Sequence, residues 1–366
     1  MMTKLDSSEL GRWPGVVVEK QEEMRALETR EVEIRAGRVL KVTPVYDTYW
    51  RFAAKRQEMF LRRVNGAARP WTDDPVLASY RFTNVYRAAD RVSQYLMRHV
   101  QYDGSQSGEE VFFRTILFKI FNRIDTWVAL QTSLGAPSWR AFDFDSYAEV
   151  LDGRLARGDR IYSAAYIMPS PPFGNARKHR NHLRLLEIMM HDGAPKRLAQ
   201  ARSLREVFEL LRSYPSMGDF LAYQFAIDLN YSELIDFSEM EFVVPGPGAR
   251  DGIRKCFVDT GGLGDGDIIR VMTERAHLEF ERLGLSLPTL WGRELQLIDC
   301  QNLFCEVDKY ARVVHPYVTG LSGRSRIKQK FLPSSGALLQ WYPPKWQLDI
   351  PLALRRDQMV SRRSQQ

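Results

Sequence analysis

The sequence predicts a mainly α-helical fold with few short strands and an extended basic C-terminal tail. Three observations support this class. Amphipathic patterns with a period near 3.6 residues follow one another from Tyr46 onward. One segment, residues 109–132, is apolar almost all round, which is typical of a buried helix. Runs with the period of a strand are short and few.

The elements are expected in the following order. Residues 1–44 form a variable lead-in with a charged surface helix at 19–37. Residues 45–320 form the helical domain, as one unit or as two docked lobes, and residues 321–366 form a basic tail that wraps over it. Within the domain the patterns predict helices at 47–64, 83–100, 109–132, 146–156, 180–192 and 203–214, and strands at 159–168 and 241–245.

Composition excludes several classes of protein. Of the 366 residues, 44% are hydrophobic and 27% are charged, as in a folded globular chain and unlike a disordered one. No apolar run approaches the roughly 20 residues of a membrane span. The first residues, MMTKLDSSEL, lack the layout of a signal peptide. We therefore expect a cytoplasmic protein with no membrane partner.

The cysteines and histidines do not predict a metal site or a cofactor. Cys256, Cys300 and Cys305 form no pair at metal-ligand spacing, and they suit reduced thiols. His179 and His182 lie in the stretch RKHRNH, which is simpler to interpret as an exposed basic patch than as a zinc site.

The formal net charge of +7 is concentrated in a few places. Residues 323–366 contain nine Lys or Arg and two Asp or Glu, and a second basic stretch lies at 175–187. Localised positive charge is typical of proteins that bind polyanions. The charge therefore fits a polyanion partner, although taken alone it fits a merely solvated basic tail as well, and no obligate protein partner is evident.

The stretch YPSMGDF at 214–220 is the most informative local pattern. Proline fixes φ and glycine permits a positive φ, so Pro215 and Gly218 predict a tight reversal between two helices. Such a reversal points backbone N–H groups outward at the start of the second helix, where the helix dipole also favours an anion such as a DNA phosphate. Taken alone, the pattern fits a plain turn between helices equally well.

This pattern resembles the hairpin of the helix-hairpin-helix DNA glycosylase superfamily, with Tyr214, Pro215, Met217 and Gly218 in its apolar-Pro-x-apolar-Gly positions. A larger part of the chain is similar to the α-glutamyl/putrescinyl-thymine pyrophosphorylase and hydroxymethyluracil DNA kinase helical-domain group. That resemblance covers roughly residues 46–315 and also suggests an anti-phage glycosylase of the group. It rests on the segments 81–91, 113–127, 214–229, 242–253 and 299–312.

The resemblance implies a helix-hairpin-helix glycosylase-like fold and a DNA glycosylase. Such an enzyme would flip and excise a hypermodified pyrimidine, such as glucosylated 5-hydroxymethylcytosine, from double-stranded phage DNA and leave an abasic site, in anti-phage defence. Phe220 stands where bifunctional relatives carry a lysine, so a monofunctional hydrolase is implied. Two alternatives stay open: a thymine-hypermodification enzyme that displaces pyrophosphate from an activated base, and a non-catalytic DNA-binding module.

A glycosylase needs a carboxylate, because positive charge develops on the sugar as the base leaves. The superfamily's usual aspartate would fall in LIDFSEMEF at 234–242, which also contains Glu239. Asp228 ends an otherwise apolar helix, where a carboxylate must be paired or functional, and a helix-end ion pair is slightly favoured there. The candidate catalytic residues are Asp228, Asp236, Glu241, Glu306 and Asp308.

The residues expected to contact DNA come from four segments. On a helix at 83–100, Asn84 and Arg87 share a face. Gly246 and Gly248 precede a helix and permit close approach of a phosphate. The candidate DNA-binding residues are Arg81, Asn84, Arg87, Pro215, Gly218, Gly246, Gly248, Lys309 and Arg312, and the candidate base-pocket residues are Tyr86, Asn122, Asp125 and Trp127.

Overall fold

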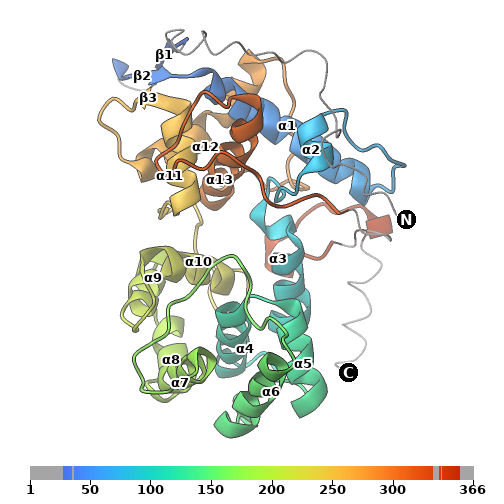
Figure 1. The fold of residues 1–366 in the computed structure, drawn as a ribbon, viewed down its shortest axis with the longest axis vertical. Helices are drawn as coiled ribbons and strands as arrows, with labels where there is room; N and C mark the ends of the chain where they lie inside the picture. Colours follow the sequence, from blue (N-terminus) through green and yellow to red (C-terminus); the bar gives the residue numbers. More distant parts are fainter. Residues whose placement is uncertain (1–27, 35–36, 333–337, 339, 355–366) are drawn as a thin grey trace, which may run out of the picture.

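A computed structural model describes residues 28–34, 37–332, 338 and 340–354, and it confirms the mainly helical class (Figure 1). Three short strands accompany thirteen α-helices in this part of the chain. The helices are α1 Pro44–Val64, α2 Pro75–Ser79, α3 Arg91–Leu96, α4 Gly108–Phe121, α5 Ile124–Leu134, α6 Phe144–Ala156, α7 Lys178–His191, α8 Ala194–Ala199, α9 Leu204–Arg212, α10 Asp219–Asn230, α11 Pro247–Cys256, α12 Asp265–Arg282 and α13 Leu297–Val314, and the strands are β1 Arg30–Glu33, β2 Val39–Val42 and β3 Phe257–Asp259.

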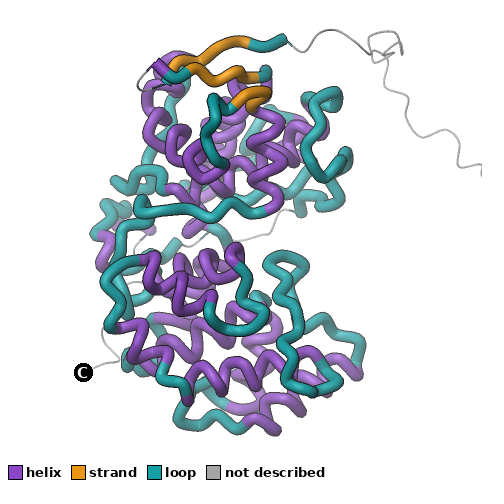
Figure 2. Tube along the Cα trace, turned by 90° about the vertical axis from the view of Figure 1, so that its left-hand side faces the viewer, coloured by secondary structure: helices purple, strands orange, loops and turns teal. Residues whose placement is uncertain are grey.

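The elements form two helical lobes that lie along the long axis of the molecule (Figures 1 and 2). The first lobe contains the sheet, α1, α2 and α11–α13. The second contains α3–α10. The chain passes between the lobes in the segment before α3 and again between α10 and α11.

Close packing of α11 on α13 holds the first lobe together. A Cβ added at Gly252 would collide with the backbone carbonyl of Phe304, so only glycine permits this approach. Tyr49 and Trp50 of α1 complete the core, and the ring of Tyr49 lies 4.7 Å from that of Phe304.

The lead-in differs from the prediction. Residues 30–33 form strand β1 and not a helix, because REVE continues into a hairpin with VLKV at 39–42. Strand β2 also pairs with β3, which directly follows α11. The described part of the lead-in is thus built into the first lobe, and the remainder of the predicted helix lies outside the described residues.

The long buried segment 109–132 is two helices and not one. α4 is buried from Val111 to Phe121, and it ends at Asn122, whose φ of +47° is left-handed. Asparagine tolerates this conformation better than most residues because its side chain can bond locally. Asn122 and Asp125 therefore do not lie on one helix.

Three further predicted elements differ. The helix expected at 83–100 is interrupted: residues 87–89 form a short 3₁₀ turn, and α3 with one π-turn covers residues 91–101. Asp90 accepts from the N–H of Asn84 and closes a turn at the break. No strand forms at 159–168 or at 241–245, where the described chain runs as loops. Ile161, Met168 and Phe242 of these segments are buried in the core, whereas Ile167 is exposed.

A described part of the C-terminal tail contacts both lobes. We call residues 340–350 the strap. The N–H of Trp341 donates to Gln94 of α3 over 2.7 Å, and Lys345 donates to three carbonyls at the end of α10. In the other lobe, the N–H of Asp349 donates to the carbonyl of Trp291.

Candidate nucleic-acid interface

The hairpin at 214–218 connects α9 to α10 and confirms the predicted reversal. The positive φ lies at Ser216, at +65°, whereas Gly218 has an ordinary φ of −68° and is the N-cap of α10. No side chain caps this helix start, so its first N–H groups face outward. The hairpin therefore exposes backbone donors at the positive end of a 12-residue helix.

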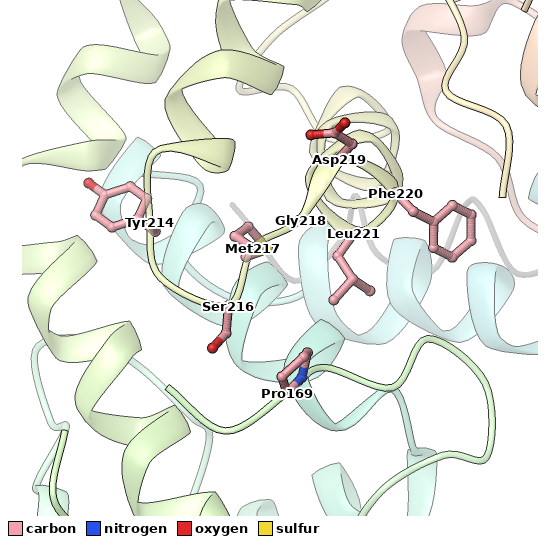
Figure 3. A pocket seen from close by; sticks show the side chains of 8 residues that line it. All are labelled: Pro169, Tyr214, Ser216, Met217, Gly218, Asp219, Phe220 and Leu221. Carbon is pink, nitrogen blue, oxygen red and sulfur yellow. The ribbon is translucent and has the colours of Figure 1, made fainter. Parts of the chain in front are cut away.

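Two open hollows flank this helix start. The larger, of about 620 Å³, is drawn in Figure 3, and the smaller, of about 400 Å³, is also lined by Glu209, Arg212 and Ser213 of α9 and its end. Both are bordered by Met217, Gly218 and Asp219. The larger is lined by Pro169, Tyr214, Ser216, Met217, Gly218, Asp219, Phe220 and Leu221.

The electrostatics of the hairpin combine both signs of charge. Asp219 places a carboxylate in the first turn of α10, and the Arg212 guanidinium lies 2.5 Å from it. Arg212 also borders the smaller hollow. An incoming phosphate would meet the helix dipole and Arg212, with the charge of Asp219 already balanced by that arginine.

An aromatic pair links the hairpin to the interior. The ring of Phe220 stacks on that of Tyr166, with 5.8 Å between centroids and 13° between planes. Tyr166 has a φ of +57°, which is strained for a tyrosine. The ammonium of Lys119 lies 4.9 Å from the same ring. Phe220 lines the larger hollow, so the buried ammonium of Lys119 lies behind that wall, next to the Tyr166 ring.

That cation belongs to a buried charge cluster around Asp228, near the end of α10. Arg87 holds both carboxylate oxygens, at 2.8 and 3.0 Å, and Lys119 lies 3.0 Å from one of them. Lys119 also donates to Asn122 over 2.8 Å. We call Arg87, Lys119 and Asp228 the buried charge cluster.

The pKa values in the cluster follow from burial and pairing. Burial alone raises the pKa of Asp228, but the charges of Arg87 and Lys119 outweigh it and hold that pKa below its ordinary value. Burial lowers the pKa of Lys119, which the charge of Asp228 offsets only in part. All three side chains are buried, and the two cations contact both oxygens of Asp228, which leaves Asp228 no free oxygen for a reaction.

The other candidate acids lie in separate places. Asp236 is largely exposed, 3.6 Å from Lys345. Glu241 accepts from the N–H groups of Leu204 and Arg205 and so caps α9. Both oxygens of the Glu241 carboxylate are therefore bonded to the start of α9.

The candidate acids of α13 are also engaged. Glu306 accepts from the N–H of Thr83 over 2.9 Å and pairs with Lys309. Asp308 is buried between Lys255 and Arg312. The structure does not bring the five predicted acids together.

The first predicted DNA-binding segment is folded inward. Asn84 is buried and accepts from Arg56 over 2.5 Å, while Arg87 belongs to the buried charge cluster. They share no exposed face, because residues 83–90 are not an α-helix. Arg81 is exposed, whereas Lys309 and Arg312 pair with acids of α13.

The two glycines ahead of α11 also differ from the prediction. A Cβ at Gly246 would lie 2.5 Å from the Phe220 ring, and one at Gly248 would collide with the sulfur of Cys305. These glycines make room for side chains of the protein itself. Pro215 and Gly218 are exposed at the hairpin, and their contact with DNA stays a prediction.

The predicted base-pocket residues do not form one pocket. Tyr86 and Trp127 are buried core residues, and Trp127 packs edge-on against Phe118. Asn122 is bonded to Lys119, and Asp125 is exposed beside Arg123. Lys119, Tyr166 and Phe220 were not predicted as site residues. A lysine inside the apolar run 109–121 was the one sequence signal for them.

Comparisons with known proteins show the family of this chain. Residues 43–320 match the family model of the 5-hmdU DNA kinase helical domain. The chain is similar to the 5-hmdU DNA kinase of Bacillus phage SP10, with 29% identity over 286 residues. The alignment covers 73% of this chain and 45% of that protein, so the chain spans less than half the length of its relative. No solved structure matches.

These findings correct the expected activity. The relative is named a kinase, which transfers a phosphoryl group, and not a glycosylase, which hydrolyses an N-glycosidic bond. The predicted base excision, abasic product, hydrolase class and defence role are therefore wrong. The family match supports the helical-domain group named from the five segments, and it gives no support to the helix-hairpin-helix glycosylase superfamily.

No α-helix in the described ranges is long and apolar enough to cross a membrane. The matched residues contain helices α1 to α13, the hairpin and the buried charge cluster, and they leave out β1, β2 and the strap. The chain belongs to the family of the 5-hmdU DNA kinase helical domain.

Proposed function

We propose that this chain binds DNA and recognises a hydroxymethylated pyrimidine as part of an enzyme that phosphorylates that base. 5-hmdU is a deoxyuridine with a hydroxymethyl group on the base, and its hydroxyl is the natural acceptor for a kinase named after it. The observation that carries the proposal is the family match over residues 43–320. The hairpin supplies a place for the DNA backbone within that range.

The geometry supports phosphate binding at the hairpin in particular. The start of α10 has no side-chain cap, it lies between two open hollows, and Arg212 stands beside it. Backbone N–H groups at a helix start, together with an arginine, are a common way to hold a DNA phosphate. Such contacts position the duplex and carry no base specificity of their own.

We propose a role in DNA recognition for these residues, and we assign no binding site for the phosphoryl donor to them. The 366 residues contain no lysine followed by serine or threonine, so the GxxxxGK[ST] phosphate-binding motif does not occur in them. We therefore propose that this helical part positions the acceptor base.

A binding measurement tests the proposal. Two duplexes of identical sequence, one with a single 5-hydroxymethyluracil in place of thymine, are titrated by fluorescence anisotropy at several salt concentrations. We expect both to bind with strong salt dependence, and the modified duplex to bind more tightly. Absence of binding to either duplex at low salt would refute the proposal.

A pair of hairpin variants tests the position of the phosphate. Gly218→Asp and Gly218→Asn both place a favourable N-cap on α10, so neither should lower stability. Only Gly218→Asp adds a negative charge, and it should weaken DNA binding at least tenfold relative to Gly218→Asn. Equal affinity of the two variants would show that no phosphate binds at this helix start.

A further inference from the structure

The tail segment 324–331 carries an exposed cation at every second position, and two of the residues between them, Ile327 and Phe331, are apolar and face the protein. Its sequence is RSRIKQKF, with Arg324, Arg326, Lys328 and Lys330 at every second position. All four are exposed, whereas Ile327 and Phe331 pack against the hydrophobic core. A period of two is that of an extended chain with one face toward the protein and the other toward solvent.

Backbone hydrogen bonds hold this segment on the first lobe. The N–H of Arg81 donates to the carbonyl of Gln329 over 3.0 Å, and the N–H of Phe331 donates to the carbonyl of Ser79 over 3.0 Å. Arg312 of α13 donates to the carbonyl of Arg326 over 3.1 Å. The row of cations is therefore fixed in position.

The exposed cations of this surface have no carboxylate partner in the described part of the chain. The ion pairs formed there involve neither the four tail cations nor Arg81, which lies beside them. The nearby acids Glu306 and Asp308 are buried and already paired with Lys309, Lys255 and Arg312. A row of unneutralised cations on an extended chain complements the regularly spaced charges of a nucleic-acid strand.

We propose that Arg324, Arg326, Lys328, Lys330 and Arg81 form a basic track that binds the sugar-phosphate backbone of DNA without regard to base sequence. This inference rests on the proposed function and adds a second DNA contact, on the lobe opposite the hairpin. The four tail cations lie beyond the residues that match the family, so this contact extends the binding surface of the helical domain. The alternate residues of an extended chain are about 6.6 Å apart, which lets successive cations meet successive phosphates.

The salt dependence of binding tests the track. The variant combines Arg324→Gln, Arg326→Gln, Lys328→Gln and Lys330→Gln, and all four positions are exposed. The matched control combines four exposed cations of the other lobe, Arg140→Gln, Arg157→Gln, Lys196→Gln and Arg202→Gln, with the same change in net charge. The dissociation constant is measured against salt from about 50 to 200 mM for the modified and unmodified duplexes. Thermal unfolding confirms that both variants fold.

The slope of log K against log salt is negative, and each lost phosphate contact reduces its magnitude by about 0.9. The track variant should therefore reduce the magnitude of the slope by about 3 to 4. Its affinity should fall by the same factor for both duplexes, because phosphate contacts do not read the base. The control should keep the wild-type slope within one unit. An unchanged slope in the track variant, or an equal fall in the control, would overturn the track while leaving wild-type DNA binding intact. A wild-type protein that binds neither duplex would overturn the proposed function itself.

Discussion

The two ends of helix α10 differ in how their backbone and charges are satisfied. At the far end Asp228 is paired with two buried cations, and Lys345 donates to the carbonyls of Asn230, Ser232 and Ile235 over 2.6 to 2.8 Å. At the near end Gly218 provides no side-chain cap and open hollows lie on both sides. The same helix thus has one end that holds the lobes together and one end whose donors remain open to a ligand.

The largest effect is expected at the paired end. Asp228→Asn keeps the shape of the side chain but leaves Arg87 and Lys119 buried without a counter-charge. Removal of one partner from a buried ionic cluster costs about 3 to 5 kcal/mol. Urea unfolding at neutral pH measures this loss. Asp236→Asn, at an exposed aspartate just beyond the same helix, is the control and should change stability by less than about 0.5 kcal/mol.

The pH dependence of that difference provides a second check. The pKa of Asp228 is lowered on folding from an ordinary value of 3.8, so its carboxylate stabilises the fold above pH 3.8. This contribution is lost as pH falls through the lower folded-state pKa. The stability gap between wild type and Asp228→Asn should therefore narrow only below about pH 4. A gap that narrows between pH 5 and 7 would contradict the pairing described here.

A smaller effect is expected from the strap. Lys345→Met removes three hydrogen bonds from a mostly buried ammonium to carbonyls at the end of α10. Hydrogen bonds from charged groups contribute about 1.5 to 3 kcal/mol each at most, and burial of the ammonium offsets part of this. We expect a net loss of about 1 to 2 kcal/mol in urea unfolding. Lys345→Arg, which keeps the charge with a different shape, should recover only part of it.

The smallest stability effect is expected at the open end. A Cβ at Gly218 meets no atom within 4 Å and the backbone there is unstrained, so Gly218→Ala should change stability by less than about 1 kcal/mol. Gly246→Ala is the comparison, because its Cβ would lie 2.5 Å from the Phe220 ring. That variant should lose more stability, by roughly 1 to 3 kcal/mol for overpacking. Equal losses, measured by thermal unfolding, would remove the contrast between the two sites.

The sequence predicted the helices that have strong local patterns. The buried run that became α4, the amphipathic run of α1 and the hairpin after α9 all carry signals within a few residues. The break at Asn122 was missed, because the apolar pattern continues across it and only the backbone reveals the left-handed residue. The strand at 30–33 was missed although its partner β2 is close in sequence, because β2 is held in the sheet by β3, which lies more than 200 residues away.

The candidate site was predictable only in part. Pro215 and Gly218 were identified because the reversal is local. Arg87 was expected on an exposed face, yet it reaches a carboxylate 141 positions later in the chain. Lys119 and Tyr166 meet Asp228 and Phe220 through tertiary packing that no spacing rule contains. Pairing of this kind depends on how several helices and loops pack together and not on any one helix.

The strap has a consequence for how a ligand would be bound. Because residues 340–350 contact both lobes, the hairpin on one lobe and the exposed cations on the other are already held in one relative orientation. A partner that spans both surfaces then gives up little additional freedom of the protein on association. The strap thus preorganises the two surfaces. Its removal should weaken association because the lobes would lose more conformational entropy on binding, although no direct contact to the ligand is lost.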